Sequence, residues 1–511
     1  MVGILSSEPG WEIVLDQIGA NWKSIGLEDE LTPENFSAII VNVIPTSLQT
    51  RSLHEFLLSG GAILGIHGCA REIYTSSAQK SYFSSLSPFQ FGEFPQNEMM
   101  DIFSDVIIET NVAREAIHFV STHLIGKGVL LNIPFDVNAL MLDVRSRRKN
   151  FYFEKKRLPS EIVATVSKGI LRRFLTRALE SLHRHRKVPF VHKWYFPEGE
   201  QTIFTFRVDS DAGTEQDVTE LFELCKRNSI PTMWFLDTKS HQEWLGRFGT
   251  FADQDIGVHC YEHSTSVSYD RNEENFVRAV SLLEKNGIHP IGASAPFGTW
   301  NRAIARVFEH LGMSFSSEFS LDYDDMPFFP MIDKRFTPVL QIPIHPICVG
   351  SMRRAGYNDQ EMLEYFRRII DKKITEREPI CLYHHPTHHR WDVIEGAFRY
   401  LRSKNIRALS YSQYARWWRE RNAHTAELEY DPNERTIRAT DVNDDANVYW
   451  RIVFPAGEES ITPLRAVTKL DSLERRHTAQ QPPPADIARV RRFDVRHVLM
   501  NSLDSWYKRT Q

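Results

Sequence analysis

The stretch Phe-Arg-Val-Asp-Ser-Asp at residues 206–211 is followed along the chain by Gly-Val-His-Cys-Tyr-Glu-His at residues 257–263. In both, an apolar run of strand length leads directly into side chains that can bind a metal. His259 and His263 are four positions apart, so one helical turn or a tight loop can point both at one ion. Asp211 would supply a third ligand, and Asp209 a carboxylate base for a metal-bound water. Three protein ligands with an open position are typical of a catalytic metal site.

The composition bounds the class of protein. A chain of 511 residues predicts two to four domains, and 42% hydrophobic with 25% charged residues is ordinary globular composition. The formal net charge of −5 argues against nucleic acid or an anionic membrane as partner. The sequence shows no signal peptide pattern and no apolar run of about 18 residues, so we expect no membrane span and a cytoplasmic location. The cysteines are scattered and predicted to be reduced: Cys69, Cys225, Cys260, Cys348 and Cys381.

Residues 1–145 alternate strand-like and helix-like stretches. Apolar runs at 38–43, 61–68 and 128–134 predict buried strands, and residues 52–58 fit a short helix. This pattern predicts a small α/β domain with a mostly parallel sheet.

Residues 146–200 are interpreted as a basic connecting helix. Its apolar residues recur near four-residue spacing, which predicts one packed face: Val166, Ile170, Phe174, Ala178 and Leu182. A solvated helix end explains the basic residues more simply than an anionic partner does.

Residues 201–422 repeat strand and helix units, with strands predicted at 203–208, 232–236, 256–258 and 380–383. Such repeats favour a barrel-like parallel sheet, whose active residues lie at the carboxyl ends of the strands. Asp209, Asp211, His259 and the pair His384 and His385 all follow predicted strands. Residues 423–511 become β-like and polar, with strands predicted at 426–430 and 447–454, and are interpreted as a β-rich accessory module and tail.

Taken in order, the segments of 201–420 resemble the NodB-type polysaccharide deacetylases, the carbohydrate esterase family 4 superfamily. The motifs that carry the resemblance are Thr205–Gly213, His259–His263, Ser294–Gly298 and Leu382–Pro386, with a weaker echo at Asp322–Asp325. The resemblance implies a distorted (β/α)7 barrel that uses one divalent metal to hydrolyse N-acetyl groups of amino sugars. It implies Asp209 as base, Asp211, His259 and His263 as metal ligands, and His385, with His384 as second candidate, as general acid.

The same resemblance implies a substrate-binding wall formed by Pro296, Phe297, Gly298, Asp322 and Asp324, with a backbone N–H near Phe297 facing the oxyanion. The chain departs from the family pattern at named positions. Ser210 separates the two aspartates, and Cys260 replaces a hydroxyl residue. Ser294 stands where the family has an arginine that orients the catalytic aspartate.

Residues Gly65–Ala70 follow a predicted strand where class I glutamine amidotransferases have a nucleophile elbow, and the N-terminal segment resembles that flavodoxin-like family. No His-x-Glu pair occurs at residues 115–140, so Cys69 has no activating base. We therefore interpret this domain as non-catalytic.

The expected function is a metal-dependent hydrolase that removes an N-acetyl or O-acetyl group from an amino sugar, oligosaccharide or polysaccharide. The expected metal is zinc, with cobalt, nickel or manganese as alternatives, because one Asp and two His tolerate all four. Two other functions stay open: an allantoinase-like hydrolase of a small non-sugar amide, and a catalytically weakened glycan-binding or scaffold protein. The expected partners are a carbohydrate or small amide and, as an open question, further copies of the chain.

Two simpler interpretations compete at the level of single residues. Asp209 and Asp211 could be turn formers after a strand. The histidines of residues 384–389 could form a metal cluster of their own, although Pro386 argues against a helix that presents them together.

Overall fold

The structure is a computed structural model that describes residues 1–71, 73–74, 78–87, 98–109, 119–153, 156–440, 447–463, 465–477, 499 and 502. The chain divides into two units. The first comprises Met1–Asp143, Val166–Glu200 and Arg419–Pro484, and the second Val144–Thr165, Gln201–Trp418 and Ala485–Gln511. Most of the predicted tail beyond residue 477 lies outside the described residues.

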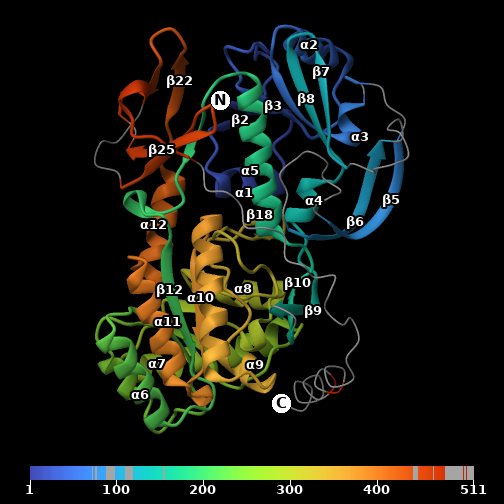
Figure 1. Cartoon of the computed structure of the whole chain (residues 1–511). Helices are drawn as coiled ribbons and strands as arrows, with labels where there is room; N and C mark the ends of the chain where they lie inside the picture. Colours follow the sequence, from blue (N-terminus) through green and yellow to red (C-terminus); the bar gives the residue numbers. More distant parts are fainter. Residues whose placement is uncertain are drawn as a thin grey trace. The chain divides into compact units, whose positions relative to one another are not determined.

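The first unit is built on a six-stranded sheet of order β2-β1-β3-β4-β8-β7 (Figure 1). All neighbours are parallel except β7, which is antiparallel to β8. The five parallel strands follow the 2-1-3-4-5 order of flavodoxin-like sheets, and the relation to amidotransferases stays a prediction. The elements are β1 (Val2–Ile4), α1 (Pro9–Ile18), β2 (Trp22–Ser24), β3 (Ala38–Val41), α2 (Ser47–Leu58), β4 (Ala62–Ile66), α3 (His67–Ala70), β7 (Ser121–Ile125), β8 (Gly128–Ile133) and α4 (Val137–Met141), with the hairpin β5 (Ala78–Leu86) and β6 (Met100–Glu109).

The remaining parts of the first unit come from later in the chain. Helix α5 (Lys168–His185) packs on β3, β4 and β8, and its predicted apolar face is buried at Phe174, Ala178 and Leu182. Strand β11 (Phe190–Lys193) joins the C-terminal strands in the sheet β11-β24-β25-β27. The β-rich character predicted after residue 423 is therefore present, in two small sheets. Their elements are β22 (Glu427–Asp431), β23 (Thr436–Thr440), β24 (Tyr449–Val453), β25 (Glu458–Pro463), β26 (Val467–Lys469) and β27 (Arg476–His477).

The segment predicted as a connecting helix is only partly helical. Residues 146–164 form an antiparallel hairpin of the second unit, β9 (Ser146–Phe153) and β10 (Lys156–Ala164). Pro159 lies at the register shift of this hairpin, where its missing N–H costs no ladder bond. Phe151, Phe153 and Leu158 pack into the core of the second unit, which favours the extended conformation.

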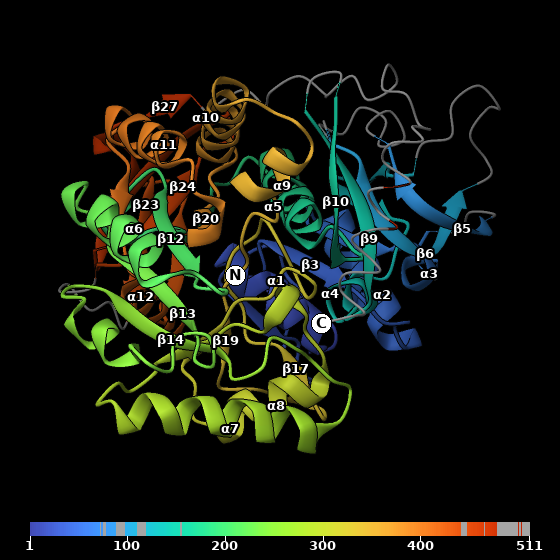
Figure 2. The same ribbon diagram turned by 90° about the horizontal axis from the view of Figure 1, so that it is seen from below.

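The second unit is a curled parallel sheet of order β19-β16-β15-β14-β13-β12-β20. Every pair along it is parallel, and β20 returns to the far side of β12. The sheet is an open half-barrel instead of a closed barrel, because β19 and β20 are not paired in the sheet; near that gap the His345 N–H donates to the Cys381 carbonyl at 2.9 Å. Figure 2 shows α6, α7 and α8 on the outside of the strands.

The strands of the half-barrel are β12 (Ile203–Asp209), β13 (Thr232–Asp237), β14 (Asp255–Cys260), β15 (Gly292–Ala293), β16 (Phe315–Ser316), β19 (Leu340–Gln341) and β20 (Ile380–His384), with the short β21 (Arg407–Ala408) beside β12. The helices are α6 (Glu215–Arg227), α7 (Tyr269–Lys285), α8 (Arg302–His310), α9 (Val349–Arg354), α10 (Asp359–Glu376), α11 (Trp391–Ser403) and α12 (Tyr411–Ala423). A two-stranded ribbon is formed by β17 (Met331–Ile332) and β18 (Arg335–Phe336). In the part of the chain that the structure describes, no helix is long and apolar enough to cross a membrane.

Arg421 ties distant segments of the first unit together. Its guanidinium is buried and donates to the carbonyls of Trp194 at 2.8 Å, Asp16 at 2.9 Å, Gln17 at 3.2 Å and Lys193 at 3.3 Å.

We expect Arg421→Met to lower the free energy of unfolding by at least about 2 kcal/mol, because it leaves buried carbonyl oxygens without a hydrogen-bond donor. Urea unfolding followed by circular dichroism measures this. Arg435→Met removes an exposed arginine paired with Asp471 and should change stability little; equal effects of the two variants would contradict the assignment.

Candidate metal centre and active site

The predicted site residues lie at the carboxyl ends of strands of one parallel sheet. Asp209 ends β12, His259 is the penultimate residue of β14, and His385 directly follows β20. In a curled parallel sheet these ends point to one side, which is where barrel enzymes place their reacting groups. Residues separated by up to some hundred and eighty positions therefore meet without long loops, as the order of strands predicts.

Asp211, His259 and His263 converge as the sequence predicts. Asp211 Oδ1 lies 3.1 Å from His259 Nε2, and Asp211 Oδ2 lies 3.2 Å from His263 Nε2. One ligand atom from each of the three residues falls within 4.8 Å of the others. Burial opposes the charged form of both Asp211 and His259. The attraction between the carboxylate and the imidazoles outweighs burial, so the pKa of Asp211 is lowered and that of His259 is raised.

This arrangement fits a metal ion. Metal–ligand bonds of about 2.0–2.2 Å in a tetrahedron separate the ligand atoms by about 3.4 Å, close to the spacing seen here. Asp211 Oδ1, His259 Nε2 and His263 Nε2 are buried and make no hydrogen bond of acceptable geometry. Buried polar atoms without a partner are costly, and a shared cation satisfies all three at once.

Ser210 explains why two aspartates separated by one residue can share a site. Its N–H donates to the Phe235 carbonyl at 3.0 Å, and its hydroxyl accepts the Asp237 N–H at 3.0 Å and lies 2.8 Å from His241 Nε2. Ser210 is therefore held against β13, while Asp209 and Asp211 on either side reach the metal centre. His241, which the sequence did not single out, is part of this support.

Arg207 holds Asp209 with both prongs of its guanidinium. Arg207 Nε donates to Asp209 Oδ1 at 2.7 Å, and Nη2 donates to Oδ2 at 2.6 Å. Both side chains are buried, with side-chain exposures of 0% and 5%. Burial by itself would raise the pKa of Asp209, but the adjacent guanidinium outweighs it and lowers that pKa. Asp209 is thus an oriented, ionised carboxylate.

This pair gives Asp209 an arginine partner from its own strand. Arg207 and Asp209 are two positions apart on one strand, so both side chains face the same side of the sheet. The arginine comes from the strand of the aspartate itself, and the i, i+2 spacing was the signal available in the sequence. Arg207 also donates to the Ser317 carbonyl, and its guanidinium carbon Cζ lies over the Phe235 ring, 5.2 Å from the ring centroid.

Glu318 is a buried acid near this pair that the sequence did not indicate. Burial raises its pKa to about 7, moderated by the Ala295 N–H, which donates to Oε1 at 3.1 Å, and by Arg207.

The structure distinguishes His385 from His384. His385 Nε2 lies 3.4 Å from Asp211 Oδ2 and 4.0 Å from Asp209 Oδ2. His384 is buried, and its Nε2 contacts the His389 carbonyl at 3.1 Å. Burial holds the pKa of His384 well below its usual range. The geometry therefore brings His385, and not His384, to the metal centre.

Pro296, Phe297 and Gly298 form the short turn after β15, and this turn flanks the centre. The Phe297 ring packs edge-on against His263, with centroids 4.7 Å apart. Phe297 has a φ of 61°, in the left-handed region that is unfavourable for a bulky residue and recurs at functional sites. The predicted oxyanion contact of its backbone stays a prediction.

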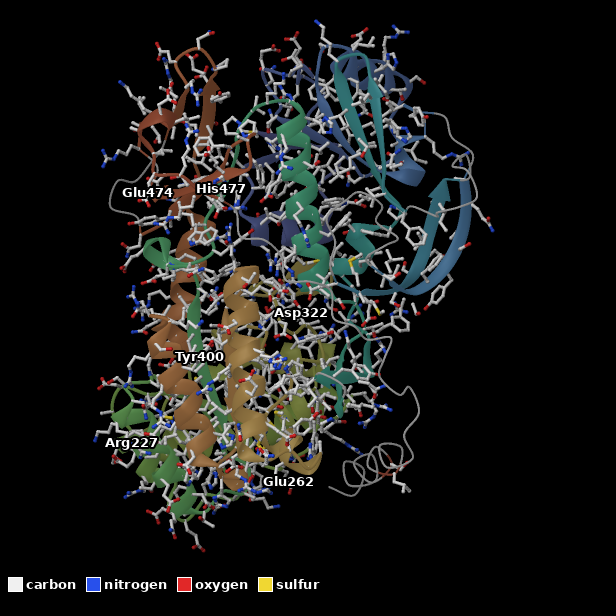
Figure 3. All side chains as sticks on the ribbon, viewed as in Figure 1. Arg227, Glu262, Asp322, Tyr400, Glu474 and His477 are labelled. Atoms are coloured by element: carbon white, nitrogen blue, oxygen red, sulfur yellow. The ribbon has the colours of Figure 1, made fainter. Side chains whose placement is uncertain are left out.

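Asp322 and Asp324 are placed differently from each other. Asp322, labelled in Figure 3, is buried, and its Oδ1 accepts the Tyr323 N–H at 2.9 Å. Asp324 Oδ1 lies 3.0 Å from His345 Nδ1 and 2.9 Å from Lys373 Nζ. Among the described contacts Asp324 belongs to this buried ionic group, away from the Asp211 cluster, and a substrate contact for either aspartate stays a prediction.

Cys348 and His388 adjoin the centre, although the sequence did not connect them with it. Cys348 precedes α9, and its Sγ lies 3.9 Å from His388 Nδ1. Burial opposes ionisation of Cys348, but contact with His385 outweighs it and lowers the pKa of the thiol to about 7. Cys348 lies far along the chain from both Asp211 and His263, so no local sequence pattern connects it with them.

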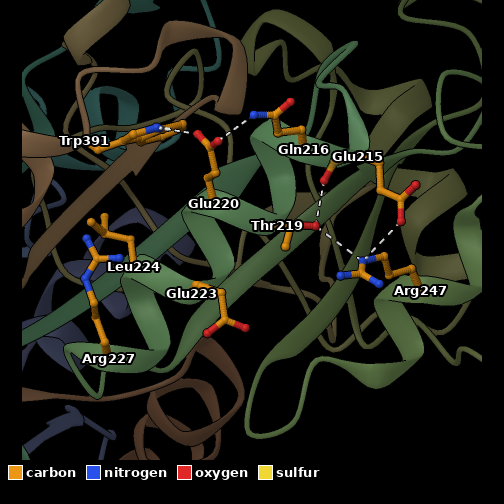
Figure 4. Close-up of a pocket in the computed structure, with 9 residues that line it drawn as sticks. All are labelled: Glu215, Gln216, Thr219, Glu220, Glu223, Leu224, Arg227, Arg247 and Trp391. Atoms are coloured by element: carbon orange, nitrogen blue, oxygen red, sulfur yellow. Dashed lines mark hydrogen bonds and ion pairs between the residues drawn. The ribbon is translucent and has the colours of Figure 1, made fainter.

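A surface hollow on the outer side of α6 is separate from this site. Figure 4 shows Trp391 Nε1 donating to Glu220 and Arg247 paired with Glu215, at 3.0 and 3.3 Å. None of the residues that line it belongs to the metal centre.

Cys69 of the first unit is not activated. Its Sγ donates to the Asn42 carbonyl at 3.2 Å, and burial together with Asp136 raises the pKa of the thiol to about 11. An activated thiol needs the opposite shift, so Cys69 is not poised as a nucleophile, and the non-catalytic role of the first unit stays a prediction.

No protein-family model matches the sequence, and no curated protein matches it significantly. Several solved structures are similar to part of the chain. A probable polysaccharide deacetylase from Pseudomonas aeruginosa is 17% identical over 45% of this chain and 95% of its own, with a TM-score of 0.39. An allantoinase is 16% identical over 45% of this chain and 94% of its own, with a TM-score of 0.40. A family 4 carbohydrate esterase from Streptomyces lividans, in complex with acetate, is 13% identical over 40% and 91%, with a TM-score of 0.30. At these scores the likeness establishes neither family nor activity, so the interpretation depends on the site's own residues.

Arg207→Met should reveal how strongly Asp209 depends on its partner. Removing the guanidinium leaves a buried carboxylate unpaired, which we expect to cost about 3–5 kcal/mol of unfolding free energy at neutral pH. In the wild type the lowered pKa of Asp209 contributes stability above its unfolded pKa of about 3.9 and loses it as the pH falls. The difference in unfolding free energy between wild type and variant should therefore shrink as the pH falls, and be smallest below the lowered pKa of wild-type Asp209, where both proteins carry a protonated Asp209.

Urea midpoints of both proteins across this pH range give the comparison. Arg227→Met is the matched control, because that arginine is exposed on α6 and paired with Glu395. A deficit that does not change with pH would show that Arg207 acts through packing alone.

Proposed function

We propose that this protein is a metal-dependent hydrolase that removes an N-acetyl or O-acetyl group from an amino sugar, oligosaccharide or polysaccharide. The observation that carries the proposal is the convergence of three metal-binding side chains, an oriented carboxylate and an unhindered imidazole on one set of strand ends. Asp211, His259 and His263 would hold the ion, and Asp209 and His385 lie within 4.0 Å of each other beside it. The resemblance of the motifs supports this chemistry.

The residues divide the reaction between them. A divalent ion held by Asp211, His259 and His263 would supply Lewis-acid polarisation of the acyl carbonyl and a more acidic water. Asp209 accepts the proton of the attacking water at Oδ2, and Arg207 keeps that oxygen in position and ionised. His385 Nε2, on the same side, donates a proton to the departing amine or alcohol. Phe297 packs edge-on against His263 and so restricts the orientation of that imidazole.

The metal site is tested by ion content. We expect His259→Ala/His263→Ala to bind one equivalent of zinc less than the wild type and to lose acetate release, because only one carboxylate ligand remains. Elemental mass spectrometry after dialysis measures the zinc, and an enzymatic acetate assay on N-acetylated oligosaccharides measures activity. His289→Ala/His310→Ala, which removes two exposed histidines, should retain both. Equal zinc content in the two double variants would overturn the site.

The role of His385 is tested by substrates with different leaving groups. We expect His385→Gln to slow amide hydrolysis by about 10²–10⁴-fold, because an amine leaves poorly without a proton. An acetyl ester of an acidic phenol should be affected far less, since its leaving group needs no proton. The ratio of kcat for the two substrates is the measurement. His384→Gln is the neighbouring control, and a larger amide-specific loss in that variant would assign the acid to His384.

The same assay separates substrate classes. Release of acetate from N-acetylated oligosaccharides supports the sugar substrate, whereas turnover confined to small amides would favour the alternative expected from the sequence. A protein that binds zinc and hydrolyses neither would be a glycan-binding or scaffold protein.

A further inference from the structure

A second group of metal-binding side chains lies beside the proposed active site. One ligand atom each from Cys348, His385 and His388 falls within 4.8 Å of the others, and Cys348 Sγ lies 3.9 Å from His388 Nδ1. Cys348 is buried, and both histidines are half-buried. A tetrahedral zinc ion with one thiolate and two imidazoles would separate its ligand atoms by about 3.4–3.6 Å, so small side-chain adjustments complete the set.

Two features of the backbone bring these residues together. The turn after β20 places both histidines on one side, and in it the His388 N–H donates to the His385 carbonyl at 3.0 Å. Gly350, in the first turn of α9, allows the helix to approach the His388 ring. A Cβ at this glycine would lie 2.1 Å from His388 Cε1. The approach that brings Cys348 to His388 therefore requires a residue without a side chain at position 350.

The two ring nitrogens of His385 have different surroundings. Nε2 lies toward Asp211 and Asp209, at 3.4 and 4.0 Å. Nδ1 is buried and makes no hydrogen bond of acceptable geometry. A buried ring nitrogen without a partner is costly. The Cys348 thiol and the His388 imidazole lie beside the same ring, and an ion held between the three residues would give this nitrogen a partner.

We propose that Cys348, His385 and His388 form a second metal site, selective for a thiophilic ion such as zinc, that shares His385 with the proposed active site. Thiolate and imidazole ligands select zinc over magnesium or calcium, whereas the Asp211 centre with its carboxylate tolerates a wider range of ions. Three protein ligands leave a fourth position open for water.

The shared histidine gives the second site a consequence, which rests on the proposed function. A ring nitrogen that holds a metal carries no proton, so an ion on Nδ1 leaves His385 only the hydrogen on Nε2. The nitrogen that holds the ion then cannot carry a hydrogen, so His385 loses the doubly protonated form that a general acid needs. Zinc beyond the first equivalent should therefore slow amide hydrolysis.

Cobalt substitution tests the site without depending on activity. Metal-free full-length protein is titrated with Co²⁺, and the near-ultraviolet thiolate-to-cobalt charge-transfer band is recorded together with bound metal. We expect two equivalents in the wild type and a charge-transfer band. Cys348→Ser and His388→Asn should each bind one equivalent fewer, and Cys348→Ser should lack the band. Cys69→Ser is the matched control, because it removes a half-buried thiol of the first unit and should retain both signals.

The outcomes separate this proposal from the proposed function. A wild type without a charge-transfer band, or a band that persists in Cys348→Ser, overturns the second site. The His259→Ala/His263→Ala variant should keep the band while it loses the other equivalent of metal, and loss of the band there would also overturn an independent second site.

If acetate is never released but the Cys348-dependent band is present, the second metal site stands and the hydrolase assignment fails. If acetate is released, its rate at two zinc equivalents relative to one should fall in the wild type and not in Cys348→Ser.

Discussion

The contact on which the site depends is the two-pronged ion pair between Arg207 and Asp209. A carboxylate at this depth is tolerated only if a charge partner and good hydrogen bonds replace its lost water. Arg207 provides both at 2.7 and 2.6 Å from two positions away on the same strand. The pairing keeps Asp209 ionised and fixes its orientation, so the proposed base is in place before a ligand arrives. It also places a permanent positive charge near Glu318, whose pKa is about 7.

The other side chains of the proposed site lie at or just after further strand ends of the curled sheet. Strand β12 carries the carboxylates, β14 leads into the histidine pair, and the turn after β15 places Phe297 against His263. Ser210 is bonded to β13, which allows two aspartates separated by one residue to reach the same space. Each side chain is thus positioned by a hydrogen-bonded strand end instead of a long loop, and such positioning keeps the distances between reacting groups short without ordering costs.

His385 connects two groups of potential ligands. Its Nε2 lies 3.4 Å from Asp211 Oδ2, its Nδ1 is buried without a hydrogen bond, and the same ring lies beside Cys348 and His388. An imidazole is the only side chain with two nitrogens that can serve such opposite neighbours at once. If zinc binds on the Cys348 side, the state of one ring links metal availability to proton transfer. In contrast, Asp324 is paired with His345 and Lys373, and this ionic group is complete without a metal ion.

The sequence by itself determined the strand ends and the residues at them. Asp209, Asp211, His259 and His263 belong to short stretches in which strand periodicity and local spacing decide where side chains point, and such local rules need no distant contact. It also predicted a small α/β domain at residues 1–145, a parallel sheet after residue 201 and β strands after residue 423. Only the tertiary structure showed that Asp324 pairs with Lys373, that residues 146–164 form a hairpin packed on the core of the second unit, and that Cys348 meets His388. Each of these depends on packing against segments far away in the chain, and such contacts are selected by the shape and burial of the whole unit, which no local pattern encodes.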